Sequence, residues 1–428
     1  MSNNQLSSIP NSKNIVRQEF PNGMIALVYE NFTSPIVSVQ GLMPVGALEE
    51  PPDKAGLASF TASCLMRGAD GLTFQQIYER IEAVGAAAGI HGGSYTTHFN
   101  AKCLVEDLPL VLNTLATVFR SPTFPTAEVE KERGEILTDL EEREDSPDVM
   151  AHLKFRELLY GNDHVYGRSR DGYLETIPRI SRDDLANFYE AHYRPDGMIF
   201  TIAGAVSAAD VLKMIQAEFG DWNPGRRSAE NSRSIPAVSR PRDIRQARIS
   251  MPEKVQCELV LGFIGPSRRD PDYLEAALCN VILGQFGLYG RLGEIIREKQ
   301  GLAYYCYSYL DNRVGPGAWQ VVAGLHPTNI DRTIESVRLE LSRLQEEIVD
   351  AEEFANNKVY VTGSLPLHLE TNGGIASNVL NMEFHDLGLD YLAQYADRIN
   401  RITPEEIQAI ARKYFDPDAY TLAVAGPV

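Results

Sequence analysis

The sequence predicts an α+β protein built from two homologous α/β-sandwich domains, and three observations support this class. The chain has 428 residues, too many for one ordinary domain, and 44% of them are hydrophobic, which is enough for two cores. The second half of the sequence repeats the first. Within each half, segments with the periodicity of strands alternate with segments that have the periodicity of helices.

The repeat is visible by direct alignment. Residues 180–206 match residues 402–428 without a gap at an offset of 222, and earlier parts of the halves match at an offset of 216. One loop insertion accounts for the change. The matched residues include Pro195 with Pro417, Gly204 with Gly426, Gly68 with Gly284, Glu82 with Glu298 and Gly85 with Gly301. Such duplication implies two similarly folded domains.

The predicted domain boundaries follow from the repeat and from a change in composition. An N-terminal domain is expected at residues 1–225 and a C-terminal domain at 249–428. Between them, residues 226–248 hold seven arginines and almost no periodic hydrophobic residue, so they are predicted to be a linker. We expect these arginines to pair with the protein's own carboxylates rather than with an anionic partner.

Hydrophobic patterning predicts the elements of the first half. Residues 1–20 are polar and are expected to form a partly ordered arm. Alternating or continuous hydrophobic runs predict strands, and hydrophobic stripes bounded by Thr, Gly or Pro predict helices. The predicted elements are strands at 24–29 and 36–43, a helix at 55–68, a helix from the cap Thr73 to Gly85, a loop and strand at 92–104, and helices at 108–119 and 126–144.

Composition excludes several classes of function. A formal charge of −18 argues against nucleic-acid binding, which needs a basic surface. The five cysteines lie far apart among hydrophobic residues, as buried free thiols in a reducing compartment would. The sequence has no secretory signal pattern, and no hydrophobic run reaches the length of a membrane span. These features predict a cytoplasmic protein without membrane contact.

One face of the helix predicted at 55–68 lacks side chains suited to binding a metal or transferring a proton. Leu57, Phe60, Thr61, Cys64 and Leu65 are expected to face the core, while Ser59, Ala62 and Ser63 share the adjoining face. The frame resembles the zinc helix of the pitrilysin family, the inverzincins, whose signature is H-x-x-E-H. By this resemblance the two histidine ligands fall on Ser59 and Ser63, and the general base falls on Ala62.

The resemblance also implies a third zinc ligand about 75 residues further on, and the matching residue is Asp139. Asp139 and Glu132 lie seven residues apart on one predicted helix face, with Arg143 a turn further on, and surface ion pairing is the simpler explanation for them. The eight histidines include no pair three to five residues apart, so no local metal motif is expected elsewhere. The sequence therefore predicts no metal and no other cofactor in this chain.

Later motifs extend the resemblance. Residues 163–167, 180–185 and 193–197 follow the order of the family's H-P-Y-G, I-x-x-x-D-L and Y-x-P motifs. Residues 287–305 are similar to the family's R-L-x-x-x-L-R-E-x-x-G-L-x-Y segment, in which an arginine and a tyrosine reach into the zinc site. These fall on Arg297 and Tyr304. The alternative is that the segment is merely buried by its hydrophobic residues while Arg297 pairs with a neighbouring acid.

The resemblance implies a fold in which two halves close like a clamshell, and a division of labour between two subunits. In some members one subunit carries H-x-x-E-H and a homologous subunit does not. This chain resembles the zinc-less subunit, inactive alone, which supplies Arg297 and Tyr304 to a zinc-binding homologue that hydrolyses unfolded peptides. Two alternatives remain open: a scaffold like the core subunits of the bc1 complex, and a self-sufficient hydrolase with another nucleophile.

Overall fold

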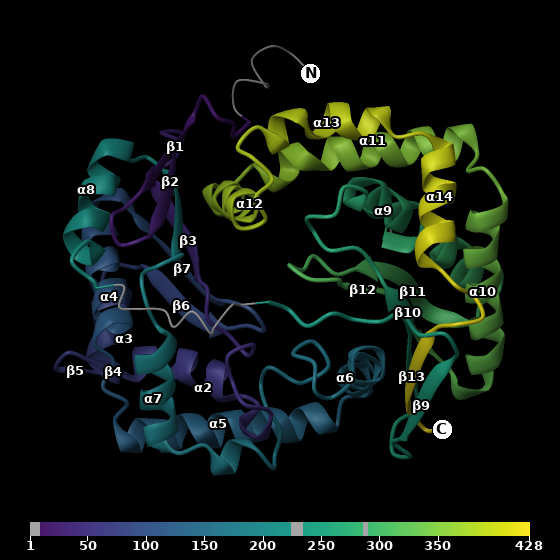
Figure 1. The fold of residues 1–428 in the computed structure, drawn as a ribbon, viewed down its shortest axis with the longest axis horizontal. Coiled ribbons are helices and arrows are strands. Elements are labelled where there is room, and N and C mark those ends of the chain that lie inside the picture. Colours follow the sequence, from purple (N-terminus) through teal and green to yellow (C-terminus); the bar gives the residue numbers. More distant parts are fainter. Residues whose placement is uncertain (1–8, 224–233, 286–289) are drawn as a thin grey trace. The chain divides into compact units, whose positions relative to one another are not determined.

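The computed structural model describes residues 9–223, 234–285 and 290–428 (Figure 1). The chain forms two compact units, and neither is one continuous segment. Unit 1 contains residues 1–140, 169–234 and 366–393, and unit 2 contains residues 141–168, 235–365 and 394–428. Each unit mixes helices with an extended sheet, as the predicted α+β class requires.

Unit 1 is built on a six-stranded sheet in the order β1-β2-β8-β3-β7-β6, in which only β2 and β8 pair in parallel. Its strands are β1 (Ile15–Glu19), β2 (Ile25–Glu30), β3 (Ile36–Met43), β6 (Ala87–Gly92), β7 (Thr97–Leu104) and β8 (Ile199–Gly204), with the short pair β4 (Gly68–Ala69) and β5 (Leu72–Thr73) apart from the sheet. Because β1 pairs with β2, the predicted N-terminal arm was wrong for residues 15–19, which form an edge strand.

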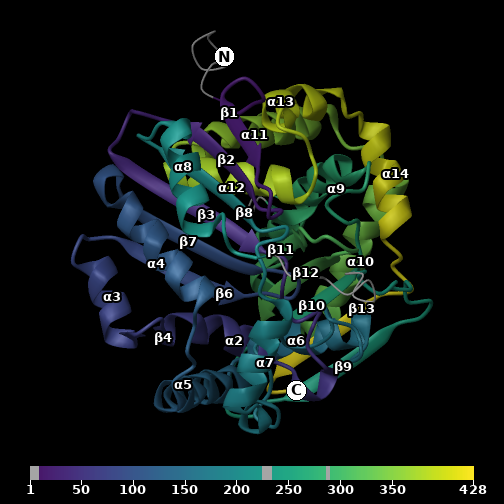
Figure 2. The ribbon, with the colours of Figure 1, turned by 60° about the vertical axis from the view of Figure 1, so that its left-hand side comes forward.

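The helices of unit 1 pack on this sheet or on one another. The α-helices are α2 (Leu57–Cys64), α3 (Phe74–Glu82), α4 (Leu108–Arg120), α7 (Arg182–His192), α8 (Ala208–Phe219) and α12 (Asn372–Phe384), and the 3-10 turns are η1 (Pro52–Lys54), η2 (Leu65–Arg67), η3 (Val105–Asp107) and η4 (Ile177–Arg179). Helix α12 contacts β3 and β8, while α4 and α8 lie on the other side of the sheet (Figure 2). Thr73 caps α3 through a capping box, as predicted.

Unit 2 is built on a five-stranded sheet in the order β11-β12-β10-β13-β9. Its elements are α6 (Pro147–Tyr160), β9 (Arg245–Ser250), β10 (Cys257–Ile264), α9 (Tyr273–Asn280), β11 (Ala303–Leu310), β12 (Ala318–Leu325), η8 (Pro327–Asn329), α10 (Ile330–Glu346), α14 (Pro404–Tyr414), β13 (Thr421–Gly426) and the π-helical turns η5 (Val281–Gln285) and η7 (Gly293–Lys299). Three helices cross from one unit into the other along the chain: α5 (Thr126–Glu144), α11 (Ala351–His368) and α13 (Tyr391–Arg401).

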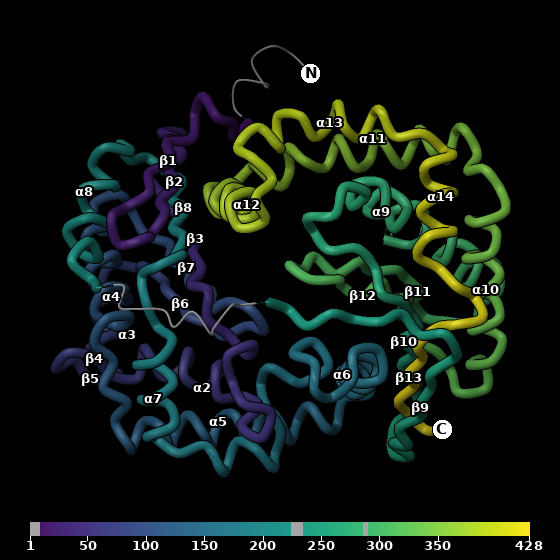
Figure 3. The backbone as a smooth tube through the Cα atoms, in the orientation of Figure 1, coloured from purple at the N-terminus to yellow at the C-terminus, as the bar shows by residue number. Residues whose placement is uncertain are grey.

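Strand β10 has a core on each face, because successive side chains of a strand point to opposite sides. Leu259 and Leu261 pack with residues of α9, α10 and α14, whereas Val260 and Ile264 pack with Ala151 and other residues of α6. Helix α6 therefore covers one face of this sheet, beside β10 and β13, as the chain trace of Figure 3 shows.

The two sheets repeat one topology, which confirms the predicted duplication of an α/β fold. The offset of 222 carries β8 onto β13, and the offset of 216 carries the start of β6 onto the start of β11. Read from these edges, β6-β7-β3-β8-β2 matches β11-β12-β10-β13-β9, and β13 pairs with β9 in parallel as β8 does with β2. Unit 1 differs by its additional edge strand β1.

The predicted linker, residues 226–248, has three parts in the structure. Residues 226–233 lie outside the described residues. Residues 234–244 contain no regular strand or helix. Residues 245–248 belong to β9, an edge strand of unit 2, so the linker prediction was wrong for these four residues because their pairing with β13 is a long-range contact. The predicted boundaries at 225 and 249 otherwise stay a prediction.

Candidate functional site

Helix α2 is fixed in unit 1 by its hydrophobic face and by a buried cap. The five residues predicted to face the core are all 4% exposed or less. Gly56 precedes the helix with φ +97°, and the carboxylate of Glu50 accepts hydrogen bonds from the backbone N–H groups of Gly56 (3.2 Å) and Ala58 (2.9 Å). A carboxylate at this end satisfies free N–H groups and favours the helix dipole. Glu50 was not found by sequence reasoning, because it lies outside the helix.

The three positions of the lost zinc signature lie on α2 as predicted, but their surroundings differ. Ala62 is fully buried, whereas Ser59 and Ser63 are half-buried. The hydroxyl of Ser63 donates a hydrogen bond to the carbonyl of Phe60 at 3.0 Å. A Cβ on Gly92 of β6 would lie 2.5 Å from the Cα of Ser59, so edge strand β6 packs directly against the helix here.

Two acidic residues of α5 were singled out in the sequence, and one of them is exposed while the other is buried. Asp139, the predicted counterpart of the third ligand, is exposed and does not line the pocket beside α2. Glu132 is 8% exposed and does line it. Its carboxylate pairs with the guanidinium of Arg67, so the predicted surface pairing was wrong for Glu132 because its partner is a residue of η2, in a part of the chain distant in sequence.

Arg67 links η2 to helices α5 and α3 in unit 1. Its guanidinium pairs with Glu132 and Glu135 and lies 3.8 Å from a carboxylate oxygen of Glu128, and it also stacks over the ring of Phe74 at 4.7 Å. The nearby carboxylates raise the pKa of the Arg67 guanidinium although its burial acts in the opposite direction. The cation that balances Glu132 is therefore part of the chain itself.

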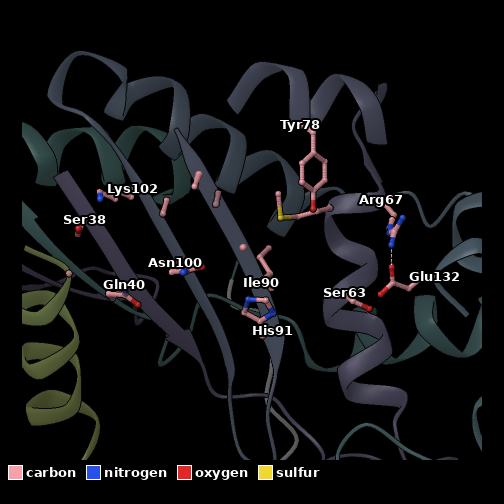
Figure 4. A pocket seen from close by; sticks show the side chains of 16 residues that line it. Ser38, Gln40, Ser63, Arg67, Tyr78, Ile90, His91, Asn100, Lys102 and Glu132 are labelled. Atoms are coloured by element: carbon pink, nitrogen blue, oxygen red, sulfur yellow. Dashed lines mark ion pairs between the residues drawn. The ribbon is translucent and has the colours of Figure 1, made fainter. Parts of the chain in front are cut away.

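A pocket of about 650 Å³ lies between α2, α5 and the sheet of unit 1 (Figure 4). Its floor comes from the small residues of edge strand β6, and its polar lining comes from several elements. The polar lining residues are Ser38, Gln40, Ser63, Arg67, Tyr78, His91, Asn100, Lys102 and Glu132. Figure 4 shows Arg67 and Glu132 pointing toward each other at one side of the pocket, with Ser63 and His91 beside them.

The residues at the lost zinc signature do not fit a zinc ion. Zinc sites use imidazole, thiolate or carboxylate ligands, and a zinc peptidase also needs a general base. Ser63 donates its proton to a backbone carbonyl, Ala62 has no polar group, and the guanidinium of Arg67 already neutralises Glu132.

Arg297 lies in the π-helical turn η7 of unit 2, and its side chain is 43% exposed. Ile296 and Leu302 are buried on either side of it, while Ile295 and Ala303 are half-buried. Its Nε lies 3.5 Å from Oε1 of Glu298, an exposed pair of the kind that contributes at most about 1 kcal/mol. The repeat-related residue, Ile81 of α3, is 3% exposed, so an arginine is not required by the shared fold.

Tyr304 lies on edge strand β11, which packs against η7, and is 61% exposed. The pairing of β11 with β12 shifts register between Ala303 and Tyr305, so Tyr304 occupies a β-bulge. Bulges turn a side chain away from the regular alternation of a strand and occur often beside active sites. Residues 287–289, the start of the predicted Arg and Tyr motif, lie outside the described residues.

Comparison with known proteins shows the family. Residues 26–166 match the family model described as insulinase, peptidase family M16, and residues 179–358 match the model of the peptidase M16 inactive domain. The chain belongs to the M16 peptidase family. This is the pitrilysin-type family that the sequence motifs indicated, and the match to its inactive-domain model supports a non-catalytic M16 member.

Relatives of similar length support the assignment. The chain is 27% identical over 420 residues to an uncharacterized zinc protease of Streptomyces coelicolor, covering 96% of this chain and 90% of the relative. It is 26% identical to the uncharacterized zinc protease YmxG of Bacillus subtilis, covering 96% and 98%. The crystal structure of a peptidase M16 inactive domain from Pseudomonas fluorescens is similar in fold to this chain, with TM-score 0.89 and 24% identity, over 97% of this chain and 98% of that chain.

No helix in the described part of this M16 chain is both long and hydrophobic enough to cross a membrane. All five cysteines are buried and free. Burial raises the pKa of the Cys103 thiol to about 11 and that of the Cys279 thiol to about 12, so neither forms a reactive thiolate at neutral pH. The described residues therefore present no cysteine suited to act as an alternative nucleophile.

Proposed function

We propose that this chain is the zinc-less subunit of a heterodimeric M16 metallopeptidase and supplies Arg297 and Tyr304 to the active site of a zinc-binding homologue. The observation that carries the proposal is a contrast between the units. The signature positions on α2 have lost every zinc ligand, whereas Arg297 and Tyr304 keep exposed side chains on neighbouring elements of unit 2. An exposed tyrosine at a bulge has no structural need for its hydroxyl.

The two side chains suit the stabilisation of charge in peptide hydrolysis. The partner's zinc would supply the activated water. The Arg297 guanidinium would bind the carbonyl oxygen of the substrate, and the Tyr304 hydroxyl would donate a hydrogen bond to the oxyanion that forms there. One donor of this kind contributes on the order of 3 kcal/mol to transition-state stabilisation, or about a hundredfold in rate.

The substrate proposed for this pair is an unfolded peptide. Strands β6 and β11 occupy equivalent edges of the two sheets, and an edge strand can bind an extended peptide through its free backbone groups. Binding through the backbone does not select a particular sequence. The five buried free thiols favour a reducing compartment, and on this basis we propose that the pair works in the cytoplasm.

The test is reconstitution of the pair with a homologue that carries H-x-x-E-H, followed by peptidase kinetics. Tyr304→Phe should lower kcat about a hundredfold with little change in KM or in assembly, since only the hydroxyl is removed. Tyr307→Phe is the matched control on the same strand, because Tyr307 is also exposed. Arg297→Ala should lower kcat/KM, whereas Lys299→Ala on the same turn should not.

The scaffold alternative predicts a different result. If Arg297 and Tyr304 only support the fold, the pairs that contain Tyr304→Phe or Arg297→Ala will turn over peptide as fast as the wild-type pair while the variants lose stability. That outcome would remove the catalytic contribution and leave a structural subunit. Size-exclusion chromatography of each mixture separates a failure of assembly from a failure of catalysis.

A further inference from the structure

A cluster of metal-ligating side chains lies in unit 2, between α6 and the five-stranded sheet. Asp148 and His152 are four residues apart on α6, and Glu258 lies on β10. One oxygen of each carboxylate and one ring nitrogen of His152 all lie within 4.8 Å of one another. The distance between His152 Nε2 and Asp148 Oδ1 is 3.5 Å.

Glu258 supplies a second, independent indication of a ligand. Its side chain points to the face of β10 that α6 covers, and the residue is 2% exposed. Oε2 accepts a hydrogen bond from the hydroxyl of Tyr305 at 2.6 Å, whereas the buried Oε1 has no hydrogen-bond partner among the described residues. A buried carboxylate oxygen without a partner is costly, so this position favours a cation or a proton.

His152 is oriented as a metal ligand. Its Nδ1 lies 3.0 Å from Oε1 of Gln320, a side chain that is 1% exposed. Because this amide oxygen only accepts, Nδ1 carries the proton, and in the neutral ring the lone pair is on Nε2, the nitrogen that faces Asp148. Metal-binding histidines commonly donate their other N–H in this way.

We propose that Asp148, His152 and Glu258 bind a divalent transition-metal ion of the zinc type. Imidazole with two carboxylates suits zinc better than magnesium, which prefers oxygen ligands alone. In a tetrahedral zinc site the ligand atoms are about 3.3 Å apart, so the 3.5 Å between His152 and Asp148 nearly fits. Small rotations of the side chains would bring the remaining ligand atoms, now within 4.8 Å of one another, to that spacing. Asp148, with its side chain 61% exposed, gives the ion a route from solvent.

The proposed ion would join α6 to the sheet of unit 2. Three protein ligands leave the fourth zinc position to water. Sequence reasoning predicted no metal because it searched for closely spaced histidines, whereas this set pairs one histidine with a carboxylate more than a hundred residues away. The inference does not depend on the proposed peptidase partnership, since binding is measured on the isolated full-length chain.

The experiment titrates Zn²⁺ into the untagged, metal-free chain and follows heat release and thermal unfolding. One equivalent of Zn²⁺ should bind and raise the midpoint of unfolding, and Mg²⁺ at the same concentration should not. Co²⁺ should give a visible absorption band from its coordinated state. His152→Ala should abolish all three effects, and Asp148→Asn, at an exposed position that tolerates substitution, should weaken binding at least tenfold.

Two control variants locate the ion. His326→Ala removes an exposed histidine outside the cluster and should bind Zn²⁺ as the wild type does. Asp139→Asn removes the acid at the lost zinc signature and should also leave binding unchanged. The proposal is overturned if the wild type binds no Zn²⁺, if binding survives both His152→Ala and Asp148→Asn, or if it is lost only in Asp139→Asn.

Discussion

Arg67 and Glu132 form the most buried ion pair beside the lost zinc signature among the described residues, with side chains 10% and 11% exposed. Such a pair adds little stability when complete but is costly to break, because a lone buried charge remains. Glu135 also pairs with Arg67, but its side chain is 50% exposed and stays solvated without it. For the stability of this pair, the guanidinium of Arg67 is therefore essential, whereas the carboxylate of Glu135 is dispensable.

Arg67→Ala should lower the free energy of unfolding by about 3 kcal/mol, because it leaves Glu132 buried without a cation. Glu135→Gln should change it by less than about 1 kcal/mol, as expected for an exposed partner. Urea unfolding followed by circular dichroism measures both. An Arg67→Ala variant as stable as Glu135→Gln would contradict the role assigned to the pair.

Helix α2 could be predicted from the sequence, but its close packing against edge strand β6 could not. The hydrophobic stripe of residues 55–68 predicted the helix and its buried face, because that information is local. The backbone contact between Ser59 and Gly92 depends on the sheet, and nothing in the spacing of residues indicates it. The same holds for Glu132, whose helix was predicted correctly but whose partner, Arg67, lies far away in sequence.

Two glycine substitutions test this description of the elements. Gly92→Ala should lower the free energy of unfolding by about 1 to 3 kcal/mol, since its Cβ would meet the backbone of Ser59 at 2.5 Å. Gly134→Ala, in the exposed middle of α5 with nothing within 4 Å of the added methyl group, should raise it by about 1 kcal/mol. Equal effects of the two substitutions would show that the contact of β6 with α2 is not tight.

The whole molecule repeats one α/β fold in two sheets of matching strand order, and the repeat could be read from the sequence because glycines and prolines mark equivalent turns. The exchange of segments between the units could not be read from it, since residues 141–168 belong to unit 2 and residues 366–393 belong to unit 1. The candidate site follows the same division. Arg297 and Tyr304 lie in a sequence motif that could be recognised. The cluster of Asp148, His152 and Glu258 could not, because only the fold brings α6 and β10 together.

Complete burial of the cysteines predicts the reactivity of the native chain. None of the five thiols should react with a thiol reagent at neutral pH within the time that free cysteine reacts, because burial hinders access and raises the pKa values of Cys103 and Cys279. All five should react after unfolding in guanidinium chloride. Rapid modification of one thiol in the native chain would contradict the described packing at that residue.

The proposed function requires that this chain helps to cleave peptides without activating the attacking water. The most direct measurement is hydrolysis of an unfolded peptide by the purified chain, by its H-x-x-E-H homologue and by their mixture, each with and without a chelator. We expect no turnover by this chain alone and chelator-sensitive turnover by the mixture that exceeds the sum of the separate subunits. Turnover by this chain alone, or a mixture no faster than the homologue alone, would contradict the account.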